Sequence, residues 1–346
     1  MRVKQARAAA QEWVTANADQ IPGFCGAFLH GSINWRSDED LLPAASDVDV
    51  VVLLADADPP VKSHKFHYCE TLLEISYLRR EQFASPELIL GQYHLSGSFR
   101  KPGILSDPSG QLTRIQAVVS REYARRPWVY RRCEAARDKV LRNLNSVESA
   151  GSFPNQVMGW LFAAGVTTHV LLVAGLNNPT VRRRYAAARD LLADYGHLDF
   201  HETLLAQLGC AYLSRAQVEA HLTALSPVFD AAQAVLQTPV PFACDLSAAA
   251  RPIAFEGSQI LIEQGLHREA MFWIAVTYSR CMTVLDHDAP AAVQAAFGPG
   301  YQRLLGDLGI AASADLHLRC GQIRAGLPEV WRVAEAIMNA NPEIEE

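Results

Sequence analysis

Two aspartates near the N-terminus could hold a divalent cation. Asp47 and Asp49 flank the first residue of an apolar, β-branched segment, residues 48–54, which has the composition of a buried strand. Residues two apart in a strand project from the same face, so both carboxylates would lie close together. Such like charges repel and desolvate badly, and a divalent cation removes both penalties. Mg²⁺ prefers oxygen ligands of this kind, and bound metal can activate an attacking oxygen and neutralise a leaving pyrophosphate.

Two further features lie on either side of this pair in the sequence. Gly31 and Ser32 follow a short apolar segment, residues 24–29; a glycine lets the backbone approach a phosphate, and serine offers an N–H and a hydroxyl. Glu74 lies in a second strand-like segment, residues 72–78, whose alternation directs it away from the more apolar face. Each feature alone is ordinary for a turn or a half-buried strand. Their order and their placement on strands favour a site for a metal and a nucleotide.

In this arrangement the chain resembles the DNA polymerase β-like nucleotidyltransferase superfamily. The signature of that superfamily is an apolar residue, then Gly-Gly or Gly-Ser, a spacer, Asp-x-Asp or Asp-x-Glu, and a third carboxylate on a later strand. The likeness is greatest to the aminoglycoside nucleotidyltransferases, which join such a domain to a C-terminal helical domain, and it covers about residues 24–78. There are two departures. Fourteen residues separate Ser32 from Asp47, which predicts an enlarged loop, and His30 rather than an apolar residue precedes Gly31.

The resemblance implies Mg²⁺-dependent transfer of a nucleoside monophosphate from a nucleoside triphosphate, with ATP expected, to a hydroxyl of a small aminoglycoside-like acceptor. Pyrophosphate would be released, and the enzyme would be an antibiotic-resistance protein. It would hold the phosphates with Gly31 and Ser32. It would bind the metal with Asp47, Asp49 and Glu74. Glu74 would act as a general base, as a metal ligand or as both.

The sequence leaves two other functions open. Six arginines between residues 121 and 137, interleaved with aromatic residues, could serve a nucleotidyltransferase that modifies RNA or a protein side chain. A solvated helix face, with Glu122, Glu134 and Asp138 as partners, is the favoured interpretation of that stretch and of the basic run at residues 182–184. The other alternative is a catalytically idle nucleotide-binding or antitoxin-like partner protein, which is disfavoured because all three carboxylates are present.

The order of predicted elements indicates an α+β fold. Helical periodicity covers residues 3–18, and strand patterns follow at residues 24–29, 48–54, 65–69, 72–78 and 104–106. From about residue 112 onward only helical segments, separated by proline-containing loops, are expected. Strands followed by helices indicate segregated layers. We therefore predict an N-terminal nucleotidyltransferase-type mixed β-sheet domain with flanking helices at residues 1–112. An all-α, acceptor-binding domain would occupy residues 113–346.

Composition points to an ordinary globular protein of the cytoplasm. The 346 residues carry a formal net charge of −6, which does not suit an extended nucleic-acid surface. Seven scattered cysteines without a CxxC pair indicate free thiols in a reducing compartment. Residues 157–176 are uncharged and long enough to cross a bilayer. A helix buried in a bundle has the same composition, so we expect a core helix and no membrane partner.

Acidic residues are plentiful in the helical half and could attract a polycationic acceptor. They are Asp190, Asp194, Asp199, Glu202, Glu256, Glu263 and Glu269. The metal-ligating residue types His64, His67 and Cys69 also lie close together in sequence. Strand positions three apart point to opposite faces, so a zinc site is not expected there.

Overall fold

The computed structural model describes residues 1–43, 45–55 and 64–346, and within them all strands precede residue 107. Five strands form one mixed sheet in the order β3-β4-β2-β1-β5. They are β1 (Phe24–His30), β2 (Val48–Leu54), β3 (His64–Tyr68), β4 (Thr71–Arg79) and β5 (Ile104–Ser106). β2 and β4 run parallel, and the other neighbouring pairs are antiparallel. With helices following, the predicted α+β class is confirmed.

β2 is the centre of the sheet and is buried on both faces. Its β-branched residues suit an extended backbone, and alternate side chains pack in opposite directions. Val50 and Val52 pack with α1 (Val3–Asn17), whereas Val51 and Leu53 join the apolar cluster that continues into the helical half. Burial on both faces explains why this segment is an uninterrupted apolar run rather than an alternating one.

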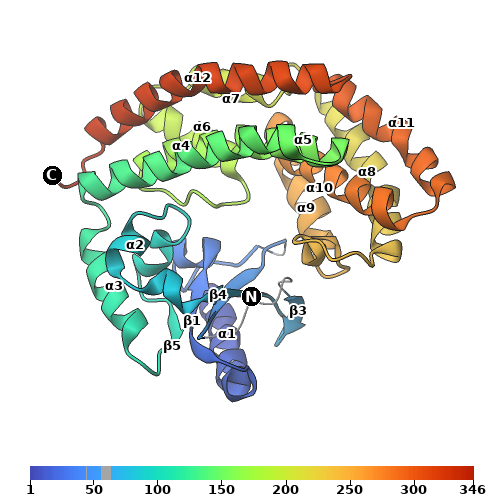
Figure 1. The fold of residues 1–346 in the computed structure, drawn as a ribbon. Coiled ribbons are helices and arrows are strands. Elements are labelled where there is room, and N and C mark those ends of the chain that lie inside the picture. The colour runs from blue at the N-terminus through green and yellow to red at the C-terminus, as the bar shows by residue number, and fades with distance from the viewer. Residues whose placement is uncertain (44, 56–63) are drawn as a thin grey trace.

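Helices follow the sheet and arch over it (Figure 1). Two of them, α2 (Pro86–Leu90) and α3 (Gln111–Glu122), lie beside the sheet. The others are α4 (Arg126–Ser149), α5 (Phe153–Ala174), α6 (Arg184–Asp194), α7 (Phe200–Gln207), α8 (Arg215–Val235), α9 (Arg251–Glu263), α10 (His267–Asp288), α11 (Ala291–Asp307) and α12 (Ser313–Ala340). α5 contacts α4, α6, α10 and α12 and is the core of the helical half.

Among the described residues, α5 is the one helix long and apolar enough to cross a membrane. Within it, 83% of the most apolar stretch of 18 residues is buried inside the protein. Its hydroxyl groups are satisfied within the helix. Thr167 and Thr168 donate to the carbonyls of Ala164 and Gly165. This burial is what we expected for a core helix, and the helix is weak evidence for a membrane role.

The arginine-rich stretch of α3 and α4 lies mostly on exposed helix faces. Arg121 and Arg125 both pair with Glu122, as the sequence predicted. Arg132 is an exception, because its guanidinium is buried 4.2 Å from the centre of the Tyr123 ring and donates to the Tyr123 carbonyl. Apart from this buried residue, the stretch has the pattern of a solvated helix face.

One apolar cluster joins the sheet to the helices. Phe28 of β1 and Leu53 of β2 belong to the same buried cluster as Val140 of α4 and Trp160 of α5. Within the described ranges the last strand ends at Ser106, so the change from strands to helices falls close to the predicted residue 112. Division into separate domains at that point stays a prediction.

Candidate metal and nucleotide site

Three carboxylates meet at one end of the central strands. Oxygens of Asp47, Asp49 and Glu74 all lie within 4.8 Å of one another, close enough to share a cation. Asp47 immediately precedes β2 and Asp49 is its second residue, so both side chains project from one face. The parallel register of β2 and β4 places Glu74 directly opposite Asp49. Leu73 and Ile75 are buried on the other face, as the alternation predicted.

Gly31 and Ser32 begin the 3₁₀-helix η2 (Gly31–Trp35), directly after β1. Gly31 has a φ of +69°, which L side chains rarely adopt, and a Cβ at this position would collide with the Asp49 carboxylate. The turn is fixed by the buried Asn34, whose side chain donates to the carbonyl of Leu29 at 2.6 Å. The backbone therefore lies directly against the carboxylates, in a position to approach a phosphate carried by a bound cation.

A lysine that the sequence did not single out lies inside the carboxylate cluster. The Lys65 ammonium is 2.8 Å from Asp47 and 3.0 Å from Glu74. A third carboxylate, Asp245, lies 3.2 Å away, and the lysine side chain is only 3% exposed. Burial disfavours its charge, but the three carboxylates outweigh burial and raise the pKa of Lys65 above its ordinary value. The lysine is a fixed cation of the site.

Asp245 joins the helical half to this cluster. It lies in η5 (Ala243–Leu246), between α8 and α9, and accepts a hydrogen bond from Arg280 of α10 at 2.8 Å. Burial disfavours the carboxylate, but Arg280 and the neighbouring lysine lower the pKa of Asp245. The adjacent Cys244 donates a weak hydrogen bond to Glu74, with 3.7 Å between Sγ and Oε1. No local motif marks either residue, because only the tertiary fold brings them here.

Asp49 is the least compensated charge of the three predicted carboxylates. Lys65 contacts Asp47 and Glu74, whereas Asp49 makes no ion pair with the part of the chain that the structure describes. Burial, together with repulsion from the neighbouring carboxylates, raises the pKa of Asp49 well above its ordinary value. Burial also raises the pKa of Glu74. A bound cation would relieve this repulsion and favour the charged carboxylates.

The donor set suits a magnesium ion. Within residues 1–43, 45–55 and 64–346, this triad is the one group of three or more His, Cys, Asp or Glu side chains arranged to hold a metal. Its donors are all carboxylate oxygens, which hard cations such as Mg²⁺ prefer, whereas structural zinc takes sulfur and nitrogen ligands. The residues present therefore fit the cation that the sequence predicted.

A cavity of about 310 Å³ opens beside the carboxylates, and two arginines line it from the helical half. The Arg182 guanidinium carbon lies 4.6 Å from the centre of the Trp273 ring, while Trp273 Nε1 donates to the Arg182 carbonyl at 2.8 Å. Arg184, the first residue of α6, is buried nearby. One buried nitrogen of each guanidinium has no hydrogen-bond partner among the described residues. Burial lowers the pKa of each arginine to about 10, so both stay positive near neutral pH.

The prediction that residues 182–184 lie on a solvated face is wrong for two of the three. Arg183 alone is exposed, and it donates to Gln264 at 2.8 Å. Successive residues at the start of a helix point in different directions, so Arg182 and Arg184 can enter a cavity while their neighbour stays in solvent. The local sequence does not distinguish the three arginines, and the tertiary fold does.

His30, the unusual residue before Gly31, is a neutral neighbour of the site. Its Nδ1 lies 2.7 Å from the hydroxyl of Ser98, and the strand register places it opposite Asp49. Burial, with a smaller effect from His94, lowers the pKa of His30 to about 4. The imidazole is therefore uncharged near neutral pH and supports the end of β1 by its hydrogen bond.

The enlarged loop before β2 packs against α1 rather than across the cavity. Arg7 of α1 pairs with Asp38 of the loop at 3.2 Å. Of the described loop residues between Ser32 and Asp47, only Ala45 and Ser46 line the cavity. The loop therefore bounds the cavity at one edge.

The acidic residues of the helical half do not form a wall of this cavity. None of the seven lines it. Glu269 is buried 3.0 Å from His201, and Glu202 pairs with Arg268 at 2.7 Å. These acids therefore do not contact a ligand in this cavity, and their attraction of a polycationic acceptor to the helical half stays a prediction.

A second cavity, of about 530 Å³, adjoins the site at Asp245. Its polar lining is largely neutral and includes Asn143, Asn155, Thr238 and Thr283. The buried Nδ2 of Asn143 has no hydrogen-bond partner in the described parts of the chain. Apart from Asp245 and Arg280, which pair with each other, this cavity offers mainly hydroxyl and amide groups to a ligand.

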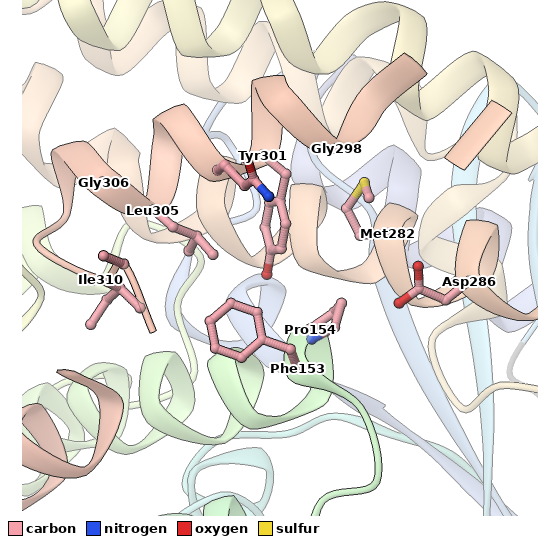
Figure 2. A pocket seen from close by; sticks show the side chains of 11 residues that line it. Phe153, Pro154, Met282, Asp286, Gly298, Tyr301, Leu305, Gly306 and Ile310 are labelled. Atoms are coloured by element: carbon pink, nitrogen blue, oxygen red, sulfur yellow. The ribbon is translucent and has the colours of Figure 1, made fainter. Parts of the chain in front are cut away.

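A third cavity, of about 580 Å³, lies between the start of α5 and helices α10 and α11 (Figure 2). The Tyr301 side chain projects toward Phe153, with Met282 and Leu305 on either side (Figure 2). Asp286 is its one charged residue among those described, and the lining is otherwise mostly apolar. It shares no residue with the carboxylate site.

No protein-family model matches this sequence, and no curated protein matches it either.

Proposed function

We propose that this protein is a Mg²⁺-dependent nucleotidyltransferase that uses a nucleoside triphosphate, with ATP the expected one, and a small hydroxylated acceptor. One observation carries the proposal. The carboxylates of Asp47, Asp49 and Glu74 converge beside the Gly31 turn, in a cavity that Arg182 also lines. Anionic ligands for a cation and a cationic ligand for phosphate in one cavity suit a metal–triphosphate complex.

Different residues would bind the cation and the phosphate groups of the triphosphate. Asp47 and Asp49 would hold the cation, which neutralises phosphate charge and polarises the bond that breaks. The backbone at Gly31 and the N–H and hydroxyl of Ser32 would donate to phosphate oxygens. The guanidinium groups of Arg182 and Arg184, which line the cavity, would complete the phosphate contacts from the helical side. This arrangement belongs to a nucleotidyltransferase-type domain, which the mixed sheet and its flanking helices can provide.

Glu74 is the proposed general base. Its raised pKa brings it closer to the working pH of an enzyme, where a carboxylate accepts a proton most effectively. It would take the proton of the acceptor hydroxyl as that oxygen attacks the α-phosphorus. The bond to pyrophosphate breaks in the same displacement, so nucleoside monophosphate passes to the acceptor.

The acceptor that we propose is a small polyhydroxylated molecule in the cavity that adjoins Asp245. Asp245 is the one carboxylate among the described lining residues, and Asn143 offers a buried amide without a partner. An aminoglycoside-like acceptor would therefore be recognised through its hydroxyls rather than through its positive charges.

The proposal is tested by incubating the purified protein with each nucleoside triphosphate, MgCl₂ and a panel of hydroxylated acceptors. We expect pyrophosphate release that requires both Mg²⁺ and one acceptor class. Asp49→Asn should abolish release while leaving the fold intact, because removal of a carboxylate also removes repulsion in the cation-free site. Release by Asp49→Asn at the wild-type rate would contradict the assignment.

A specific observation supports one alternative, a nucleotide-binding partner protein without catalytic activity. Lys65 lies where a cation would contact both Asp47 and Glu74. A protein that no longer used metal could neutralise its acidic cluster in this way. Such a protein would bind triphosphate without any requirement for Mg²⁺, which calorimetric titration with and without MgCl₂ would reveal.

A further inference from the structure

The Lys65 ammonium occupies a position that a metal ion could otherwise take. It lies 2.8 Å from Asp47 and 3.0 Å from Glu74, at hydrogen-bond distance from both carboxylates. In a site with two divalent cations, the carboxylates of two neighbouring strands bridge the ions. Here one bridging position, between Asp47 and Glu74, already contains a positive charge.

The backbone fixes this position. β3 and β4 are joined by Cys69 and Glu70, whose φ angles of 44° and 60° are those of a tight hairpin turn. The resulting register places Lys65 directly opposite Glu74 on the neighbouring strand. Cross-strand neighbours on one face of a sheet are in contact. The Lys65 ammonium can therefore contact Glu74 while the lysine backbone stays paired in β3.

The helical half holds the lysine from the other side. Asp245 accepts from Lys65 at 3.2 Å and from Arg280 at 2.8 Å. The lysine side chain is 3% exposed, so a departure from the cluster would leave the half-buried Asp47 and Glu74 carboxylates without their cation. Lys65 is therefore a permanent part of the site rather than a surface side chain that has turned inward.

The position between Asp47 and Asp49, by contrast, contains no lysine or arginine side chain from the described residues. Asp49 makes no ion pair with any residue that the structure describes, and it faces the Gly31 turn, where a phosphate can approach. The three carboxylates form three pairs. The Asp47–Glu74 pair holds Lys65, whereas neither pair that includes Asp49 contains a cationic side chain from the described parts of the chain. Asp49 lies beside the Gly31 turn, so the open position is the one that a phosphate can approach.

We propose that Lys65 replaces one of the two divalent cations, so that the site binds a single Mg²⁺ together with the nucleotide. The inference rests on the proposed transfer reaction. In that reaction the acceptor oxygen forms its bond to the α-phosphorus, its proton passes to Glu74, and pyrophosphate departs with the electron pair of the broken bond. Lys65 exchanges no proton; its ammonium stabilises the negative charge that develops on the attacking oxygen.

The stoichiometry of Mn²⁺ binding tests this directly. The full-length protein is titrated with MnCl₂ in the presence of α,β-methylene-ATP, and bound Mn²⁺ is counted by electron paramagnetic resonance and calorimetry. We expect one Mn²⁺ per chain in the wild type. Lys65→Met leaves its position open without a charge and should bind a second Mn²⁺, whereas Lys65→Arg should still bind one. Lys101→Met, an exposed lysine outside the site, is the matched control and should bind one.

Transfer rates give a second measurement. Lys65→Met should lower turnover by about 10²- to 10³-fold at the Mn²⁺ concentration that saturates the wild type, because one preorganised positive charge is lost. Turnover should recover in part as Mn²⁺ is raised and the second ion binds. A lysine with a purely structural role would show no such recovery.

The outcomes separate this inference from the proposed function. Two Mn²⁺ ions in the wild type would overturn the inference and leave the nucleotidyltransferase proposal intact. One Mn²⁺ in Lys65→Met would also overturn it. If the analogue binds without Mn²⁺ or not at all, both proposals fail. Should Lys65→Met not fold, as circular dichroism would show, the count in the wild type decides alone.

Discussion

Asp49 has the least favourable electrostatic environment in the candidate site. It is half-buried beside two other carboxylates, and the one lysine in the cluster contacts those two instead. In the absence of a cation its raised pKa means that the folded protein binds this proton more tightly than the unfolded chain does. The contribution of Asp49 to stability is therefore present below its ordinary pKa and is lost as pH rises through the raised value.

The raised pKa of Asp49 predicts that Mg²⁺ stabilises the folded protein more at about pH 8 than at about pH 5. Mg²⁺ and the proton compete for the same carboxylate, so the free-energy cost of displacing the proton falls as pH rises. Thermal unfolding with and without MgCl₂ at both pH values measures the effect. Asp49→Asn should show little stabilisation at either pH. An equal Mg²⁺ effect at the two pH values in the wild type would contradict the assigned role of Asp49.

Secondary-structure elements show which parts of the site the sequence could specify. β2 has the predicted bounds, because a β-branched run has few alternatives to a buried strand. The predicted strands at residues 65–69 and 72–78 leave Glu70 and Thr71 between them, but the turn residues are Cys69 and Glu70. Neither is the Gly or Asn that usually marks such a turn, so the sequence did not predict a register between the two strands. The observed register places Lys65 opposite Glu74, which is why the sequence did not single out the lysine.

At the level of the β1–η2 turn, we predict that Gly31→Ala weakens binding of Mg²⁺–ATP at least about 10-fold, which corresponds to about 1.4 kcal/mol. Gly110 is the matched control, because its φ of +71° is nearly that of Gly31 at +69°, while a Cβ there would contact nothing. Both variants share the strain of a positive φ, and only Gly31→Ala drives a methyl group into Asp49. Calorimetric titration compares the two. Equal affinities would show that the turn does not approach the phosphates.

Residues of the helical half complete the site whose three carboxylates come from the N-terminal strands. Arg182, Asp245 and Trp273 come from separate parts of the helical half, more than one hundred residues from the carboxylates in sequence. The sequence could predict the acidic motif because its members follow one another on strands. It could not predict the arginines, since their approach depends on how α5, α6 and α10 pack. The net charge of −6 likewise does not reveal the two arginines in this cavity.

The final prediction concerns the contribution of the helical half to nucleotide binding. Arg182→Ala should weaken the affinity for Mg²⁺–ATP by about 10- to 100-fold, which corresponds to the roughly 1.5–3 kcal/mol of a hydrogen bond to a charged group. Arg183→Ala removes the same side chain one residue away, where it is exposed and donates only to Gln264, and should bind like the wild type. Arg182→Lys keeps the charge but loses the planar contact with Trp273, so an intermediate affinity is expected. Thermal unfolding of each variant separates lost binding from lost packing. If Arg182→Ala and Arg183→Ala bind Mg²⁺–ATP equally well in calorimetry, the helical half does not contact the triphosphate, and the phosphate ligands must come from the Gly31 turn and the cation alone.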